Sequence, residues 1–234
     1  MQRRRFIANT LGAVASTPFW TTAFGSVSTA QPTLIRPPLL SAGDTVGVLA
    51  SGTAVSDPDK LLSAKQVLDY FDLKMKLGQY VLKGSGYKTR SVDERLDDLH
   101  TLFADNSVKA IFELRGGYGC AQLLDQIDYQ LIRQNPKIFL GFSDITALHL
   151  AIHQHAQLVT FHGPVLISAF PEYTVEHLRK ALFTSEPIGP VSNSNSKRGI
   201  RRRYPVRTIR SGQAKGQLIG GNLTLISTTM GTPY

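Results

Sequence analysis

Short apolar runs alternate with amphipathic stretches along residues 44–183, and this alternation sets the expected architecture. The runs are rich in Val, Ile, Leu and Phe, and several stop at glycine or serine, a pattern that is typical of strands. The stretches between them repeat apolar positions at helical spacing. We expect strands at 44–50, 73–82, 108–114, 137–140 and 159–161. We expect helices at 57–71, 91–103, 120–127, 144–155 and 175–183, the second with a capping box at its start.

Strands that alternate with helices predict a parallel sheet covered by helices on both faces. Ligand sites of such sheets lie at the carboxyl ends of the strands. Three turns made of glycine or serine fall at expected strand ends: Ser51-Gly52, Arg115–Gly119 and Gly141–Ser143. Their convergence at one edge of the sheet predicts the position of a functional site.

Ser143 is the first candidate for chemistry. In the stretch 138–146 (IFLGFSDIT), an apolar run stops at Gly141, and Ser143 precedes helix-forming sequence. A nucleophile elbow needs a small residue two positions before the serine, which Gly141 supplies, and another two positions after it, where Ile145 stands. The match is therefore partial, and an ordinary N-cap serine is the alternative. Backbone N–H groups at the start of the following helix could hold an oxyanion.

The glycine turn Arg115–Gly119 (RGGYG) is the second candidate. Glycines between a strand and a helix let the backbone turn tightly and present N–H groups to an anion. The turn is neither a dinucleotide-binding fingerprint nor a P-loop, so it gives little support to a nucleotide site. Arg115 could pair with a substrate carboxylate. The alternative is a structural turn with a surface arginine.

Other reactive side chains point less clearly to chemistry. Cys120 could be a thiolate nucleophile at a helix start, but a lone cysteine in an apolar helix favours packing. His149 and His153 have the spacing of a zinc helix, yet Leu150 stands where a general-base glutamate would be expected, and no third ligand is evident. His162 either lines the site or ends a strand. We therefore expect no metal site.

Composition and the N-terminal stretch add expectations about size and location. The chain has 234 residues, 42% of them hydrophobic, which is enough for a core, and a single cysteine excludes an intrachain disulfide. Arginines, a mildly apolar stretch and small residues follow one another within 1–30, which predicts a twin-arginine-type export signal. That stretch is too short and too polar for a stable membrane span. An exported bacterial protein of this kind would be periplasmic; an unused signal, or a mere basic tail, would leave it cytoplasmic.

The chain changes character after residue 170. Residues 171–211 are polar and basic, and apart from the expected helix they predict a linker. The net charge is +9, and part of it gathers in 196–210. A nucleic-acid surface is the alternative for that cluster, but no aromatic ladder or nucleic-acid motif accompanies it. A second unit begins near 212–234, and roughly 20 residues cannot bury a core of their own.

Six short motifs occur in a characteristic order. They are RGGYG at 115–119, LLDQIDY at 123–129, GFSDITALH at 141–149, FHGP at 161–164, GGNL at 220–223 and GTPY at 231–234. Together they resemble the LD-carboxypeptidases, a family of serine peptidases that includes muramoyltetrapeptide carboxypeptidase and the microcin-immunity hydrolases. Several motifs in order are far more specific than any one of them.

The resemblance implies a Rossmann-like N-terminal domain with a parallel sheet at 33–170, followed by a β-rich C-terminal domain. Residues 212–234 would be the incomplete beginning of that second domain. It also implies a hydrolase that releases a terminal D-alanine from an L-centre in a murein tetrapeptide. The reaction would be acyl transfer by a Ser-His-Glu triad, with no cofactor.

The resemblance assigns roles to four residues of this sequence. Ser143 would be the catalytic nucleophile, Asp144 and Gly117 would supply the N–H groups of the oxyanion hole, and Asn222 would face the site and bind the substrate. From its charge we also expect Arg115 to bind the substrate, together with Gly116 of the glycine turn.

The end of the sequence departs from the family pattern, because the family's Glu and His follow the Gly-Thr-Pro motif and the sequence stops at Tyr234. We therefore expect a truncated chain without peptidase activity of its own, and a non-catalytic muropeptide-binding remnant is the alternative. The expected partner is a peptide rather than nucleic acid, and a homodimer stays open.

Overall fold

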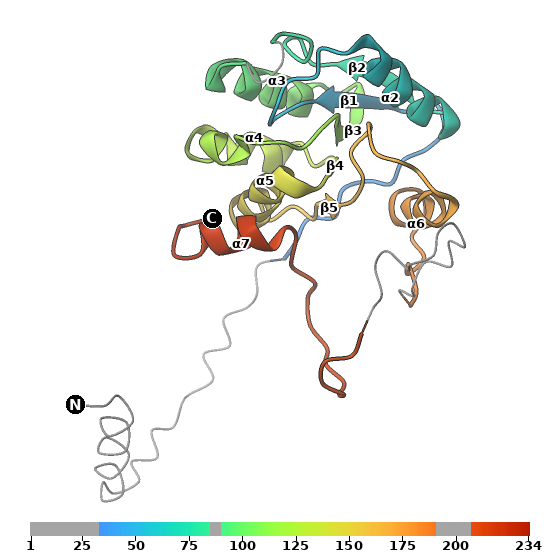
Figure 1. Ribbon diagram of the computed structural model, residues 1–234, viewed down its shortest axis with the longest axis vertical. Coiled ribbons are helices and arrows are strands. Elements are labelled where there is room, and N and C mark those ends of the chain that lie inside the picture. Colours follow the sequence, from blue (N-terminus) through green and yellow to red (C-terminus); the bar gives the residue numbers. More distant parts are fainter. Residues whose placement is uncertain (1–32, 85–89, 191–206) are drawn as a thin grey trace, which may run out of the picture. The chain divides into compact units, whose positions relative to one another are not determined.

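A five-stranded parallel sheet forms the centre of the chain in the computed structural model (Figure 1). The structure describes residues 33–84, 90–190 and 207–234, which belong to one unit, Thr33–Tyr234. The strands are β1 (Thr45–Leu49), β2 (Lys74–Leu77), β3 (Val108–Glu113), β4 (Ile138–Gly141) and β5 (Phe161–His162), in the order β2-β1-β3-β4-β5. This arrangement confirms the expected α/β fold class and puts a topological switch point between β1 and β3.

Helices connect the strands, and one of them begins with the capping box that the sequence predicts. The α-helices are α2 (Pro58–Tyr70), α3 (Val92–Ala104), α4 (Tyr129–Gln134), α5 (Thr146–Ala151), α6 (Glu172–Phe183) and α7 (Leu223–Thr229). The other helical segments are η1 (Cys120–Gln126) and η2 (Ser143–Ile145), both 3-10, and the π-helical η3 (Ile152–Ala156). Ser91 and Glu94 form the expected capping box of α3. Helix α4 was not expected; it follows Asp128, whose carboxylate accepts a hydrogen bond from the Leu131 N–H.

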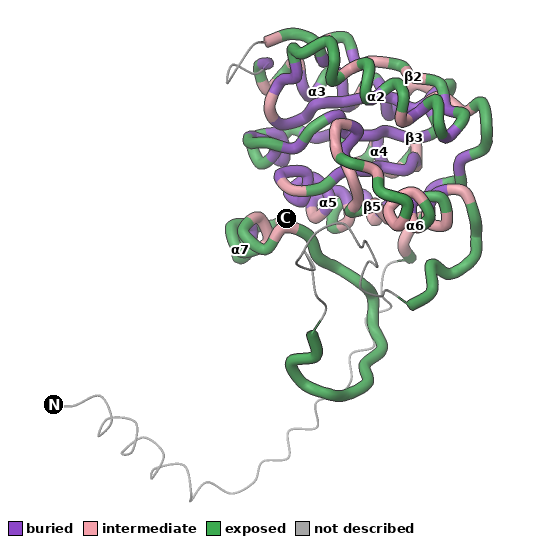
Figure 2. The backbone as a smooth tube through the Cα atoms, turned by 45° about the vertical axis from the view of Figure 1, so that its right-hand side comes forward, coloured by how far each residue is buried: buried purple, intermediate pink, exposed green. Residues whose placement is uncertain are grey.

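Both faces of the sheet are buried, as a parallel sheet requires (Figure 2). Helices α2 and α6 pack on one face, whereas α3, η1, α4 and α5 pack on the other. The side chains of β3 alternate between the two, with Phe112 in the cluster of α2 and α6 and Ile111 in the opposite cluster. Two separate hydrophobic cores therefore hold the sheet in place.

The carboxyl ends of β1, β3, β4 and β5 lie side by side. Leu49 is in register with Glu113, and Gly141 is in register with His162. The three glycine or serine turns that the sequence placed at strand ends therefore meet at one edge of the sheet, as predicted.

Two strands differ from their expected bounds because other hydrogen bonds compete for their backbone. The second strand is shorter than expected, since the Tyr80 N–H donates to the carboxylate of Asp98 rather than to a neighbouring strand. Strand β5 begins two residues later than expected, because the Val159 N–H donates to the carbonyl of Ile35 in the lead-in segment.

The expected β-rich second domain that begins at 212–234 stays a prediction, and the described part of this segment, 207–234, contains helix α7 and no strand. The reason is local: the Asn222 side chain accepts hydrogen bonds from the N–H groups of Thr224 and Leu225 and starts a helix. Helix α7 then packs on α5.

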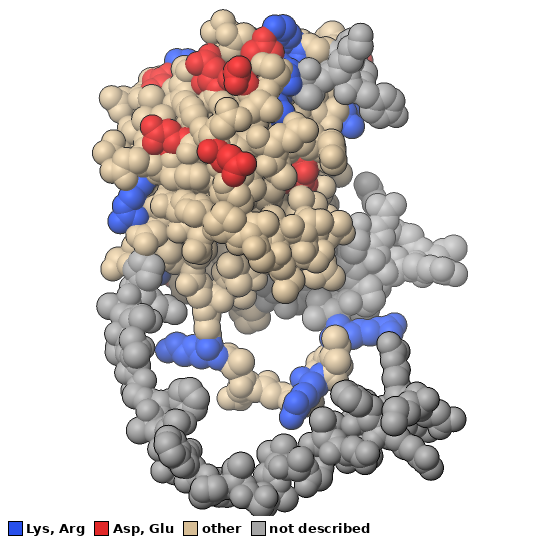
Figure 3. Space-filling view, turned by 90° about the vertical axis from the view of Figure 1, so that its left-hand side faces the viewer, with Lys and Arg blue, Asp and Glu red and all other residues tan. Residues whose placement is uncertain are grey.

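The expected export signal at 1–30 lies outside the described residues, as does most of the basic cluster at 196–210. The described part of that cluster, 207–210, is exposed, and Figure 3 shows in blue the described Lys and Arg side chains on the face that it presents. Among the described residues, no helix is long and apolar enough to cross a bilayer.

Candidate active site

Ser143 occupies a sharp turn between β4 and α5. Its φ angle is 66°, in the left-handed region that residues other than glycine rarely adopt. An N-cap residue has extended backbone, and the residue in that position before η2 is Phe142, which makes no side-chain cap bond. The N-cap alternative for Ser143 is therefore wrong. A strained, half-buried serine at the end of a parallel strand is instead typical of a nucleophile elbow.

Gly141 explains how the turn tolerates Ile145, the residue that departs from the elbow pattern. A Cβ atom on Gly141 would lie 2.9 Å from Cγ2 of Ile145 and 3.1 Å from Cβ of Glu113. Ile145 is fully buried in the core on the side of α3 and α5. The elbow pattern has a second small residue at the position of Ile145. Here the absence of a Cβ atom on Gly141 makes the room that the Ile145 side chain needs.

The glycine loop passes directly beside Ser143. A Cβ atom on Gly116 would lie 3.2 Å from Cβ of Ser143, 3.2 Å from the carbonyl oxygen of Phe142 and 3.7 Å from the backbone nitrogen of Asp144. The structure therefore brings Gly116, Ser143 and Asp144 together. Gly117, the next residue, has a φ angle of 118°. Arg115 is exposed at the start of the loop and takes part in none of the ion pairs of the described residues.

Gly117→Ala is expected to lower the free energy of unfolding by about 3 kcal/mol, because it adds a steric clash to an unfavourable φ angle. Its Cβ atom would lie 2.2 Å from Oγ1 of Thr53, which accepts a hydrogen bond from the Tyr118 N–H. Gly43→Ala is the matched control, since Gly43 has a φ angle of 86° but no atom within 4 Å of the added Cβ. We expect Gly43→Ala to lower the free energy of unfolding by about 1 kcal/mol, and urea unfolding of both variants measures the two losses. Equal losses in the two variants would contradict the proposed close packing of the loop.

The side chain of Asp144 joins the serine turn to the start of η1. One of its oxygens, Oδ2, accepts a hydrogen bond of 2.9 Å from the Cys120 N–H. Cys120 itself is fully buried, and burial raises the pKa of its thiol well above the ordinary value. A protonated, buried thiol is a poor nucleophile, so the structure argues against the thiolate alternative for Cys120.

Two histidines lie beneath and beside the turn. His149 is buried, its Nε2 lies 2.9 Å from the carbonyl oxygen of Gly141, and burial lowers its pKa to about 4. The His162 ring lies 5.9 Å from that of His149 and 6.4 Å from that of Phe142, between ring centres. No hydrogen bond among the described residues links a histidine to Ser143. Among the described residues, no group of three or more His, Cys, Asp or Glu side chains is arranged to hold a metal ion.

Asn222 lies against α5 and is anchored there by its backbone. Its N–H donates to Oγ1 of Thr146, three residues after Ser143. Its side-chain oxygen caps α7, as described above. The structure thus places Asn222 against the helix that follows the serine turn, with its carbonyl oxygen already engaged.

Sequence reasoning missed a buried polar cluster under the glycine loop. Glu113 ends β3 with 0% of its surface exposed, and its carboxylate accepts hydrogen bonds from the N–H and the hydroxyl of Ser51. Arg95 of α3 donates from Nη1 to the carbonyl oxygens of Ser51 and Gly119. The available signal was a charged residue within an otherwise apolar run, AIFELRGG. Burial raises the pKa of Glu113 to about 7.

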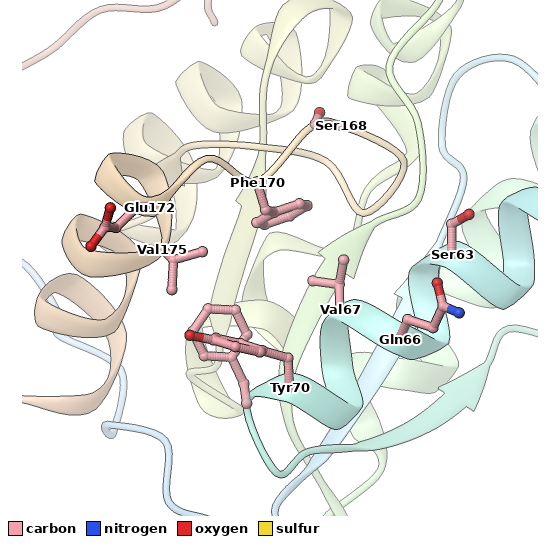
Figure 4. A pocket seen from close by; sticks show the side chains of 9 residues that line it. Ser63, Gln66, Val67, Tyr70, Ser168, Phe170, Glu172 and Val175 are labelled. Carbon is pink, nitrogen blue, oxygen red and sulfur yellow. The ribbon is translucent and has the colours of Figure 1, made fainter. Parts of the chain in front are cut away.

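A cavity of about 470 Å³ lies away from the serine turn, between α2 and the segment that leads into α6 (Figure 4). Apolar and aromatic side chains dominate its wall. Its lining residues are Ser63, Gln66, Val67, Tyr70, Phe71, Ser168, Phe170, Glu172 and Val175. Because none of the predicted site residues lines it, the turn geometry rather than this cavity identifies the candidate active site.

Comparison with known proteins adds evidence to this geometry. The family model described as the LD-carboxypeptidase N-terminal domain matches residues 46–163. The chain is 41% identical over 199 residues to a probable murein peptide carboxypeptidase of Bacillus subtilis, a match that covers 85% of the chain and 60% of that protein. It is 32% identical over 196 residues to a murein tetrapeptide carboxypeptidase of Pseudomonas aeruginosa, covering 80% of the chain and 60% of that protein. The chain spans about 60% of the length of these curated relatives.

Solved structures share the fold. A microcin self-immunity protein in complex with aspartyl sulfamoyl adenosine superposes with a TM-score of 0.71 at 26% identity, covering 86% of this chain and 67% of that one. Another form of the same protein, with the same TM-score, is an active-site mutant in which a serine, an asparagine and a lysine are replaced by alanine.

Proposed function

Because the chain belongs to the LD-carboxypeptidase family, whose N-terminal domain it carries at residues 46–163, we propose that it supplies the nucleophile and the oxyanion hole of a serine peptidase of LD type. The observation that carries the proposal is the left-handed backbone of Ser143 beside the glycine loop. Strain of this kind persists only where the surrounding structure enforces it, and it clusters at active sites. The serine among the active-site residues of the microcin self-immunity protein supports the same role.

The geometry suits acyl transfer. The Ser143 hydroxyl oxygen would attack the carbonyl carbon of an L-configured residue and form a C–O bond while its proton passes to a base. The N–H groups of Asp144 and Gly117 would stabilise the oxyanion. The peptide C–N bond then breaks, D-alanine leaves with the proton returned by the base, and water hydrolyses the acyl-enzyme.

The described residues offer no evident base for the first proton transfer. His149 is engaged by Gly141, and its lowered pKa makes it a weak base. No ion pair of the described residues joins His162 to a carboxylate that could orient it. The family resemblance assigns the base to a histidine oriented by a glutamate. We therefore propose that the 234-residue chain by itself releases D-alanine several orders of magnitude more slowly than a complete serine peptidase.

The engagement of His149 by Gly141 favours a second candidate function, a non-catalytic protein that binds muropeptides. The names of the two curated relatives support a murein peptide as the ligand in either case. The expected export signal would bring the protein to peptidoglycan in the periplasm. Export and a homodimer both stay predictions, which cell fractionation and sedimentation would test.

The testing experiment incubates the chain with a murein tetrapeptide and, separately, with a fluorophosphonate probe. In the second reaction the Ser143 oxygen forms a bond to phosphorus, the P–F bond breaks, fluoride leaves, and the hydroxyl proton passes to the buffer. We expect slow labelling of Ser143, read by intact mass and peptide mapping, because positioned oxyanion donors alone retain part of the catalysis. Peptide binding without any labelling would support the non-catalytic function instead.

Arg115→Ala is expected to weaken binding of a murein tetrapeptide with a free C-terminal carboxylate at least tenfold. A guanidinium–carboxylate hydrogen bond is charge-assisted and strong, and Arg115 is exposed and free of the described ion pairs. Calorimetry with the tetrapeptide and its C-terminal amide separates this contact from the rest of the interface. The amide should bind wild type and variant equally, and Arg36→Ala, at another exposed arginine, is the control. An equal loss of affinity for the free acid and for the amide would contradict a contact between Arg115 and the C-terminal carboxylate.

A further inference from the structure

Glu113 is a buried charged residue for which the reaction has no direct use. It ends β3 at the centre of the sheet, in register with Leu49, and its own carbonyl oxygen accepts a hydrogen bond from the Leu166 N–H. Its carboxylate faces away from solvent, and 0% of the residue is exposed. A buried carboxylate is costly unless it is hydrogen-bonded, so such a residue calls for a structural or functional reason.

Both oxygens of that carboxylate hold Ser51. The Ser51 N–H donates to Oε2 at 3.0 Å, and the Ser51 hydroxyl bonds to Oε1. Ser51 is separated from Glu113 by 62 positions in the sequence and is itself buried. The two bonds therefore join the turn after β1 to the end of β3, across the switch point of the sheet.

The Ser51-Gly52 turn, which Glu113 holds, packs closely against the glycine loop. A Cβ atom on Gly52 would lie 2.9 Å from the carbonyl oxygen of Gly116 and 3.1 Å from Oδ2 of Asp144. The next residue, Thr53, receives a hydrogen bond from the Tyr118 N–H. Contacts therefore run without a gap from Glu113 through the Ser51-Gly52 turn to Gly116, which lies beside Ser143.

We propose that Glu113 is a positioning residue of the active site, which holds the Ser51-Gly52 turn so that the glycine loop is set at the distance from Ser143 that oxyanion binding needs. This inference rests on the proposed function. It assigns Glu113 no contact with substrate. Displacement of an oxyanion donor by about 1 Å is enough to slow an acyl-transfer reaction markedly. Because glycines restrict the backbone little, contacts from outside the loop are needed to fix its position.

The other charged groups near the carboxylate do not replace this contact. Arg90 and Asp144 interact with Glu113 electrostatically, with opposite effects on its charged form. Nε and Nη1 of Arg90 are buried without a hydrogen-bond partner, so the guanidinium does not engage the carboxylate directly through those two atoms. Burial raises the pKa of Glu113 to about 7, so a neutral side chain of the same shape can serve in its place.

The test compares Glu113→Gln with Glu113→Leu in fluorophosphonate labelling of the 234-residue chain. The glutamine amide can accept from the Ser51 N–H and donate to its hydroxyl, whereas leucine can do neither. We expect Glu113→Leu to lower kinact at least tenfold with KI unchanged, and Glu113→Gln to retain at least a third of the wild-type kinact. A general loss of structure would change KI as well and would not be confined to the rate of bond formation.

Ser51→Ala is the second variant, in case Glu113→Leu does not fold. It removes one of the two bonds and should lower kinact about threefold to tenfold, while Ser63→Ala on the exposed face of α2 should leave it unchanged. Wild-type kinact in folded Glu113→Leu or in Ser51→Ala would overturn the positioning role. Ser143→Ala separates this failure from that of the proposed function: labelling that persists in Ser143→Ala rejects the nucleophile itself, whatever Glu113 does.

Discussion

Ser143→Gly is expected to abolish fluorophosphonate labelling and, at the same time, to raise the free energy of unfolding by about 1 kcal/mol. The hydroxyl is the nucleophile, so the labelling rate should fall at least 10³-fold. Glycine adopts a φ angle of 66° without the steric cost that serine bears there, so the folded state should be relieved of strain. Active-site residues commonly lower the stability of the fold in return for activity, and Ser143 is expected to do the same.

Ser143→Ala is the matched control for that prediction. Alanine removes the hydroxyl but keeps the Cβ atom, so labelling should be lost without the gain in stability. Urea unfolding and intact-mass labelling of the three proteins measure both effects. If Ser143→Gly is no more stable than Ser143→Ala, the turn is not strained. The left-handed backbone of Ser143 would then no longer support the proposed function.

Glu113→Gln is expected to change the pH dependence of stability by about 3 kcal/mol between pH 4.5 and 7. Burial raises the pKa of Glu113 from its ordinary 4.5 to about 7. Across that window the folded state keeps a proton that the unfolded state has lost, so the contribution of Glu113 to the free energy of unfolding falls as pH rises. Glutamine cannot titrate, and the variant should therefore gain stability over the wild type as pH rises from 4.5 to 7.

His149 supplies an opposing slope. Burial lowers its pKa from 6.5 to about 4, so between these values the unfolded state binds a proton that the folded state does not. The free energy of unfolding then rises with pH, by up to about 3 kcal/mol, and largely offsets the contribution of Glu113 between pH 4.5 and 6.5. In His149→Gln, the free energy of unfolding should fall as pH rises, because only the contribution of Glu113 remains. In Glu113→Gln it should rise with pH, because only the contribution of His149 remains.

Urea unfolding of the wild type and both variants at half-unit steps from pH 4 to 7.5 measures these slopes. Differences from the wild type isolate each group from other titrating residues. If the stability of Glu113→Gln differs from that of the wild type by the same amount at every pH, Glu113 is ionised in the folded state and its pKa is not raised.

The sequence allowed the sheet and the position of the site to be predicted, because both depend on local signals. Apolar runs of Val, Ile and Leu identify β1, β3 and β4, and Gly141 with Ser143 identifies the serine turn. The distinction between an elbow and an N-cap could not be predicted, since it depends on the φ angle of Ser143 and on the close packing of Gly141 against Ile145. Spacing alone carries no information on that packing.

The buried cluster and the C-terminal helix were missed for two different reasons. Glu113 pairs with Ser51 across 62 positions, and no local pattern reports a contact at such a separation. Helix α7 was not expected, because the family resemblance described this segment only as the beginning of a β-rich domain, whereas the cap by Asn222 and packing on α5 form a helix here.

The long separation between Ser51 and Glu113 has a consequence for the order in which the chain gains its reactivity. The turn after β1 is complete early in the chain, but its partner at the end of β3 must first be brought to it by closing a loop of 62 positions, and Ser143 follows only after β4. Contacts of this kind form late, because their loop-closure entropy precedes any gain. Reactivity at Ser143 should therefore appear together with the fully folded sheet, so that the labelled fraction of a refolding sample counts the native molecules.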